Sequence, residues 1–162
     1  MTNTKALLEV HGVSRSFGGL KAVQNVSLQV PQGSLTALIG PNGAGKTTLF
    51  ALLSGFLTPD TGRVVFKGQD ITGQAPHLNA KWGMTRTFQI VQPFAAQTVR
   101  ENIAVGAHLH TASREQALAT AEQVAQRVGL ADQLDKLASD LTVAGRKRLE
   151  LARALATAPQ LL

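Results

Sequence analysis

The sequence predicts an α/β fold, and three observations predict it. Strand-like apolar runs at 7–11, 25–30 and 63–67 make the first part of the chain rich in strands. A glycine-rich loop at 40–48 stands between a predicted buried strand at 34–39 and a predicted helix at 46–54. From residue 98 onward the pattern becomes helical. Strand, glycine-rich loop and helix in this order are typical of a nucleotide-binding core.

The predicted strands are separated by turns at 15–20, 58–62 and 68–70, where glycine, proline and aspartate gather. Phe17 lies in the first of these turns, upstream of the glycine-rich loop. Its ring could stack on an adenine or fill the core, and sequence physics leaves these two roles open.

The loop at 40–48 fits the phosphate-binding pattern Gly-x-x-x-x-Gly-Lys-[Ser/Thr]. Its glycines let the main chain approach a phosphate, and successive amides then form an anion-binding nest. Lys46 would place its charge at the β- and γ-phosphates, Thr47 would bind Mg²⁺, and Thr48 would lie by the α-phosphate. A glycine-rich turn that binds nothing is the alternative, and the flanking strand and helix argue against it. The predicted phosphate-binding residues are Gly40, Asn42, Gly43, Ala44, Gly45, Lys46, Thr47 and Thr48.

The later part of the chain carries three predicted helices. Capping boxes at 98–101 and 113–116 open the first two, which end near Leu109 and at Gly129. The third covers 145–157, and an apolar strand begins at 160–162. Before these helices, an extended run at 84–88 ends in Gln89.

Composition excludes several classes of protein. With 162 residues, 44% apolar and 16% charged, the chain predicts a globular domain with a real core. It has no cysteine, which excludes disulfides and thiolate metal sites and suits the cytosol. No apolar run is long enough to span a membrane, and residues 1–5 lead into no signal-peptide core.

The net charge of +6 is compatible with nucleic acid or with anionic lipid or nucleotide nearby. The basic residues are scattered except at 146–148, and no aromatic residue interleaves with that run. We therefore expect no nucleic-acid partner.

Several stretches together resemble the ATP-binding subunits of ABC transporters. The loop at 40–48 matches the family's phosphate loop, Phe17 matches its adenine-stacking aromatic residue, and Gln89 matches its magnesium- and water-sensing glutamine. Residues 141–145 occupy the place of the family signature Leu-Ser-Gly-Gly-Gln, and 148–155 are similar to the helix that follows it. The runs at 84–89 and 92–102 resemble the branched-chain amino acid importers in particular.

The resemblance implies a P-loop NTPase core of the ABC ATPase type, with an antiparallel β subdomain and an α-helical subdomain. The implied boundaries are 1–90 for the core with the β subdomain, 91–141 for the helical subdomain, and 142–162 for the signature helix and the next core strand. ATP and Mg²⁺ are the implied ligands, with Lys46 and Gln89 catalytic and Thr47 and Gln89 at the metal. Thr142 and Ala144 would face the ATP of a second ATPase subunit. Permease subunits in the membrane would bind the protein at the cytoplasmic face, as a peripheral subunit.

Two departures from the family pattern affect these expectations. Val143, Ala144 and Gly145 replace the last three signature residues, and the added Cβ atoms stand where close approach to a phosphate is needed. The family also continues into a strand ending in Asp-Glu and then to a histidine, and this sequence ends before them. We therefore interpret the chain as the N-terminal part of such an ATPase, incomplete at the C-terminus, and expect no turnover by residues 1–162 alone.

Three alternatives stay open. One is an ATPase of another ABC class, such as a lipid or lipopolysaccharide exporter, and another is a non-catalytic nucleotide-binding fragment. The third is a different P-loop protein. A GTPase lacks support because no Asn-Lys-x-Asp occurs, and the stretch between Gln89 and Leu141 is too short for a repair ATPase's coiled coil. A nucleotide kinase is disfavoured by the Gln89 and Leu141 regions.

Overall fold

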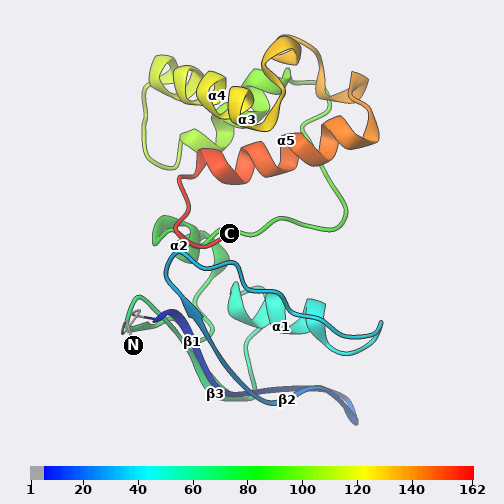
Figure 1. Cartoon of the computed structure of the whole chain (residues 1–162), viewed down its shortest axis with the longest axis vertical. Coiled ribbons are helices and arrows are strands. Elements are labelled where there is room, and N and C mark those ends of the chain that lie inside the picture. The colour runs from blue at the N-terminus through cyan, green and yellow to red at the C-terminus, as the bar shows by residue number, and fades with distance from the viewer. Residues whose placement is uncertain (1–5) are drawn as a thin grey trace. The chain divides into compact units, whose positions relative to one another are not determined.

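The computed structural model describes residues 6–162, and the chain divides into two compact units, Met1–Asn79 and Ala80–Leu162 (Figure 1). Residues 1–5, for which the sequence predicts no signal-peptide core, lie outside the described residues. Each unit has its own secondary structure and packing, and each is described by itself.

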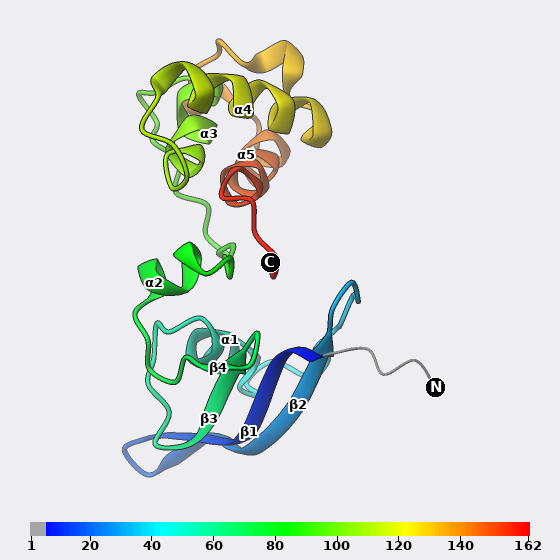
Figure 2. The same ribbon diagram turned by 90° about the vertical axis from the view of Figure 1, so that its left-hand side faces the viewer.

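The first unit is built on a four-stranded antiparallel sheet in the order β2-β1-β3-β4 (Figure 2). The strands are β1 (Ala6–Phe17), β2 (Leu20–Pro31), β3 (Thr61–Phe66) and β4 (Gln69–Asp70). The strands predicted at 7–11 and 25–30 are confirmed but are longer than expected. The predicted turn at 15–20 is narrower, because β1 runs to Phe17 and only Gly18 and Gly19 turn the chain. The turn predicted at 68–70 contains the short strand β4.

Alternate apolar residues of β1 and β3 supply the core of the first unit. Val10 pairs with Val64, and both side chains are buried, as is Phe66 two positions further along β3. The helix α1 (Lys46–Leu53) contacts β2 and adds the buried side chains of Leu49 and Leu52. This packing fixes the start of α1, where the phosphate-loop pattern ends.

The prediction of a buried strand at 34–39 is wrong for this structure. The segment has no strand assignment, and Ile39 is 91% exposed although its side chain is strongly apolar. A central parallel strand needs hydrogen-bonded neighbours on both sides. Among the described residues the sheet pairs only β1, β2, β3 and β4, all antiparallel, so nothing here supplies those neighbours. An apolar pattern alone does not form a strand, because pairing partners decide whether one forms.

The second unit is a helical bundle. Its main helices are α3 (Val99–Ala107), α4 (Arg114–Val128) and α5 (Val143–Ala156), which pack around one hydrophobic core (Figure 1). The helix α2 (Pro76–Lys81), which the sequence reasoning missed, precedes them, and 3-10 turns occupy Ala131–Gln133 and Ala138–Asp140. The fully buried core residues include Val99, Ile103, Ala117, Ala121, Ala125, Leu130, Leu149 and Ala152.

The helix ends follow the capping residues that the sequence contains. Thr98 forms the predicted reciprocal capping box with Glu101, and Ser113 accepts a hydrogen bond from the Gln116 amide at the start of α4. Gly129 ends α4 in the left-handed conformation, with a φ of 70°. The third helix begins two residues earlier than predicted, at Val143, because the Thr142 hydroxyl caps it.

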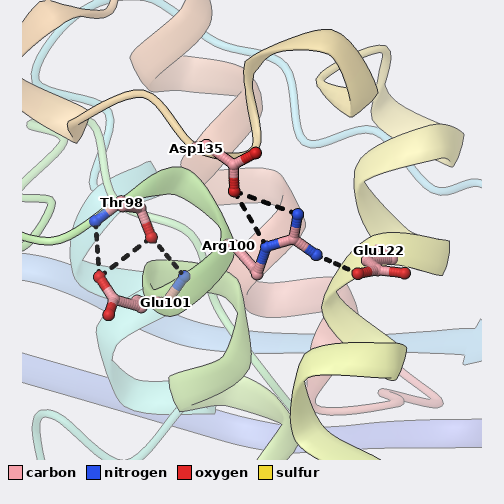
Figure 3. A network of polar contacts seen from close by, with 5 residues as sticks. All are labelled: Thr98, Arg100, Glu101, Glu122 and Asp135. Atoms are coloured by element: carbon pink, nitrogen blue, oxygen red, sulfur yellow. Dashed lines mark hydrogen bonds and ion pairs between the residues drawn. The ribbon is translucent and has the colours of Figure 1, made fainter.

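Polar contacts tie α3 to neighbouring segments of the second unit (Figure 3). The Arg100 guanidinium, on α3, forms ion pairs with Glu122 of α4 and with Asp135, whose carboxylate oxygen lies 3.1 Å away. The hydrogen bond to Asp135 is the main reason that the pKa of Arg100 is raised. These pairs link α3 to α4 and to the segment that leads into α5.

The capping box at Thr98 makes the stability of this unit depend on pH. The Thr98 amide and hydroxyl donate to the Glu101 carboxylate over 2.9 and 3.0 Å, which holds the pKa of Glu101 below its ordinary value of 4.5. Because the folded-state pKa is lowered, this stabilisation is fully present above pH 4.5. It is lost as the pH falls through the lower, folded-state pKa.

We expect Glu101→Gln to flatten this acid response. Glutamine also completes a capping box but does not titrate, so the variant keeps its cap at every pH. The denaturant concentration at the midpoint of unfolding can be measured by circular dichroism at a series of pH values. As the pH is lowered from 4.5, this midpoint should decrease more steeply in the parent protein than in the variant. If the midpoints of the two proteins decrease equally at low pH, Glu101 is not the cause of the pH dependence.

Candidate functional site

The glycine-rich loop has the backbone geometry that its sequence predicts. Gly43 and Gly45 have φ values of 84° and 81°, in the left-handed region that favours glycine. A Cβ atom at Gly45 would lie 2.2 Å from the Ala22 carbonyl oxygen of β2, so this residue is also required for close packing. The loop is therefore held against the sheet at the point where α1 starts.

Lys46 turns its side chain back over the same loop. Its ammonium donates to the carbonyl oxygens of Gly40 and Pro41, each over 2.7 Å. The ammonium thus lies above the loop instead of extending into solvent. The Ala44 amide donates to Pro41 over 3.3 Å, which adds a turn within the loop.

The start of α1 fits an anionic ligand. Its N-cap, Gly45, has no side chain with which to cap the helix, and no acidic residue lies in the first turn. The first-turn amides of a helix have no partner within the helix, and their dipoles favour negative charge. Thr47 is exposed and Thr48 half-buried in this turn. Loop, ammonium and helix start together fit the phosphates of a nucleotide, with the Thr47 hydroxyl as a hard oxygen ligand suited to Mg²⁺.

Phe17 ends β1 on the surface of the first unit. Its side chain is 43% exposed, which excludes the core-filling role left open by the sequence. The Arg15 guanidinium lies over the ring, 5.1 Å from its centroid, and is itself held by Asp60 over 2.7 Å. The ring therefore has a fixed orientation and an accessible surface, as stacking on a base requires.

Gln89 belongs to the second unit and is exposed. The run before it, predicted as extended, forms one isolated parallel bridge, between Met84 and Leu161. The Thr85 amide donates to the Leu161 carbonyl over 3.0 Å. The apolar strand predicted to begin at 160–162 is thus represented by this single bridge.

Thr142 and Ala144 lie at the exposed start of α5. The Thr142 hydroxyl accepts the Gly145 amide over 3.1 Å, so it acts as the N-cap of its own helix. Val143 is 72% exposed, and Ala144 is exposed beside it. The Arg146 side chain donates to the carbonyls of Leu141 and Ser139, each over 3.1 Å, and holds the preceding turn in place.

The sequence reasoning missed two side chains of α5 that contact the segment around Gln89. The Glu150 carboxylate accepts a hydrogen bond from the Phe88 amide, and Arg153 donates to the Gln92 carbonyl over 2.9 Å. The two residues of each pair are 62 and 61 positions apart in the sequence, so no local sequence pattern predicts the contacts. The only available signal was their shared face on the helix.

Two features are absent from residues 6–162. In this part of the chain, no group of three or more histidine and acidic side chains is arranged to hold a metal ion. Nor does any helix described there combine the length and apolar character needed to cross a bilayer.

Comparison with known proteins identifies the family. The family model described as ABC transporter matches residues 23–162. LivG of Escherichia coli (strain K12), a high-affinity branched-chain amino acid transport ATP-binding protein, is 38% identical over 174 residues, which cover 98% of this chain and 68% of LivG. CysA of Synechococcus elongatus, a sulfate/thiosulfate import ATP-binding protein, is 40% identical over 163 residues, which cover 100% of this chain and 46% of CysA.

A solved structure is similar over the same range. The structure of MJ1267, an ATP-binding cassette of an ABC transporter, superimposes with a TM-score of 0.88 at 34% identity, covering 96% of this chain and 67% of that one. The fold predicted from the sequence is confirmed by this similarity. The chain therefore belongs to the ABC transporter family and has the fold of its ATP-binding cassettes.

Proposed function

We propose that this chain binds Mg-ATP through residues 40–48 and serves as an ATP-binding subunit of a transporter. The observation that carries the proposal is the Lys46 ammonium held over a glycine loop at an uncapped helix start. Phosphate chains bind at such sites because main-chain amides and one positive charge face them together.

Each residue of the site has a distinct role in this proposal. When bound, Mg-ATP supplies the γ-phosphoryl group that is transferred to water. Lys46 exchanges its two carbonyl acceptors for phosphate oxygens, and Thr47 offers its hydroxyl to the metal. Phe17 stacks on the adenine. Gln89 orients water and metal, and this contact is what would make it catalytic.

The partners follow from the family. We infer a second ATPase subunit, to whose nucleotide Thr142 and Ala144 are presented at the exposed start of α5. We infer membrane permease subunits, and hence a peripheral position at the cytoplasmic face. The functional parts are then residues 1–90, 91–141 and 142–162, in the roles that the sequence predicts.

Branched-chain amino acids are the proposed transported substrates. LivG carries that function in its name, and its match covers 68% of its own length, against 46% for CysA. The runs at 84–89 and 92–102 support the same subfamily. Because residues 1–162 alone are expected not to hydrolyse ATP, the test uses a chimera in which they replace the matching 68% of LivG. Membrane vesicles containing this chimera and the permease should take up leucine, isoleucine and valine when loaded with ATP. Uptake of sulfate in place of these amino acids would redirect the substrate assignment.

The central test is nucleotide binding by residues 1–162. We expect saturable binding of ATP by titration calorimetry, tighter with Mg²⁺ than with a chelator, because Thr47 and the metal act together. We expect no release of phosphate, because this sequence contains no strand ending in Asp-Glu to polarise the water. Absence of any binding would reject the proposal, and steady Mg-dependent hydrolysis would reject the inactivity of these residues alone.

A further inference from the structure

The segment that carries Gln89 is fastened along one face of α5. We call residues 85–94 the Gln89 strap. Glu150, Arg153 and the C-cap residue Thr157 follow one another at intervals of three and four, which places them on the same side of the helix. Each of the three contacts the strap, and together they hold it on both sides of Gln89.

The contacts define the path of the strap. Thr85 Oγ1 lies 2.7 Å from Thr157 Oγ1, and the Phe88 amide then donates to Glu150, two turns nearer the start of α5. Beyond Gln89 the chain returns, because Arg153 donates to the Gln92 carbonyl and its guanidinium lies 4.7 Å from the Phe94 ring centroid. Gln89 is therefore in the bend of the strap, one residue after the Glu150 contact.

The orientation of this face is fixed by the core. Leu149 and Ala152, which flank Glu150 on α5, are fully buried against α3 and α4. Gly106 of α3 lies so close to α5 that a Cβ atom there would be 2.3 Å from the Arg153 carbonyl oxygen. Since α5 cannot rotate without breaking this packing, Glu150 is held toward the strap.

We propose that Glu150 is a positioning residue for Gln89, holding its backbone to α5 through the Phe88 amide. A carboxylate that accepts from a backbone amide makes a stronger hydrogen bond than a neutral acceptor, so Glu150 is the strongest anchor next to the bend. The proposal rests on the proposed function, in which Gln89 acts at the nucleotide. Glu150 touches neither nucleotide nor water in this role.

The contact also connects two parts of the proposed machinery within the second unit. Thr142 caps the start of α5, and Glu150 lies eight positions further along the same helix. A rigid helix transmits a displacement of its start to its other residues. A displacement of the start of α5 would therefore reach the bend that carries Gln89.

The test compares Glu150→Ala and Glu150→Gln with the control Glu115→Ala in residues 1–162. Glu115 is an exposed carboxylate in the first turn of α4, so its loss removes the same charge away from the strap. Nuclear magnetic resonance of ¹⁵N-labelled protein reports the Phe88 and Gln89 amides directly. We expect Glu150→Ala to speed hydrogen exchange at Phe88 about tenfold, Glu150→Gln to restore most of the protection, and Glu115→Ala to change nothing.

Nucleotide provides the second measurement. In the parent protein, Mg-ATP should shift the Gln89 amide resonance. In Glu150→Ala that shift should disappear while the Kd for Mg-ATP changes less than about twofold, because the phosphate loop is intact. Glu150→Gln should recover the shift. If Glu150 only stabilised the fold, its loss would not selectively remove the Mg-ATP-induced shift of the Gln89 amide.

The outcomes separate the two proposals. If Phe88 exchange and the Gln89 response are the same in Glu150→Ala as in the parent, the positioning role is overturned while ATP binding stands. If Mg-ATP fails to bind the parent protein, the proposed function is overturned, and the Phe88 exchange data still decide whether Glu150 anchors the strap. If Glu150→Ala unfolds, the amides of α3 and α4 will also exchange quickly, and Glu150→Gln then decides the question. Exchange at Phe88 close to the parent rate in Glu150→Gln supports the positioning role. Exchange as fast as that of an amide without a hydrogen bond overturns it.

Discussion

Lys46→Ala is expected to weaken Mg-ATP binding by residues 1–162 about 10- to 150-fold, because it removes one charged hydrogen-bond donor worth about 1.5–3 kcal/mol. The ammonium already lies over the loop, where it donates to Gly40 and Pro41 over 2.7 Å. Little reorganisation is therefore needed before it can contact phosphate oxygens. The substitution removes both this charge and the two contacts that Lys46 makes with the loop.

The matched control for this experiment is Lys147→Ala, on the exposed side of α5. Both variants lower the net charge by one, so any general attraction of ATP to a basic protein is reduced equally. Calorimetric titrations should show a large loss of affinity for Lys46→Ala and almost none for Lys147→Ala. Lys46→Arg should bind at an intermediate level, because its planar fork keeps the charge but not the compact shape of an ammonium. If Lys46→Ala and Lys147→Ala bind Mg-ATP with equal affinity, Lys46 does not contribute to the site.

The parts that the sequence predicted well are local in the chain. Residues 40–48 are contiguous, so their pattern alone predicts glycines with backbone angles that other residues rarely adopt, as Gly43 and Gly45 have. The contacts of Lys46 with phosphate stay a prediction. The reciprocal capping box at Thr98 spans four residues, and the Gly129 helix end needs only its neighbours. Short-range chemistry of this kind is decided by residue type and spacing, which a sequence displays directly.

The parts that failed depend on distant partners. The strand expected at 34–39 requires neighbouring strands that residues 6–162 do not place beside it. The contact of Glu150 with the Phe88 amide joins positions 62 apart, and the orientation of Arg15 over Phe17 depends on Asp60. The functional boundaries at 90/91 and 141/142, and the roles of Gln89, Thr142 and Ala144, stay predictions because they concern ligands and subunits outside this chain.

Gly45→Ala should strongly destabilise the first unit. The residue has a φ of 81°, which costs an alanine about 1–2 kcal/mol. Its new Cβ would also lie 2.2 Å from the Ala22 carbonyl oxygen, a backbone atom that cannot rotate away. Overpacking of this kind costs about 1–3 kcal/mol, so the two effects together predict a loss of about 2–5 kcal/mol.

Gly43→Ala distinguishes the cost of the positive φ from the cost of the clash with β2. Gly43 has nearly the same φ, 84°, but no atom lies within 4 Å of the position that its Cβ would occupy. It should therefore show only the conformational cost of about 1–2 kcal/mol. Amide hydrogen exchange at Leu49 and Val23, on either side of the contact, reports the opening free energy of this region in both variants. If Gly45→Ala and Gly43→Ala destabilise this region equally, close packing of the loop against β2 contributes nothing. The geometry of the loop at 40–48 then depends on backbone angles alone.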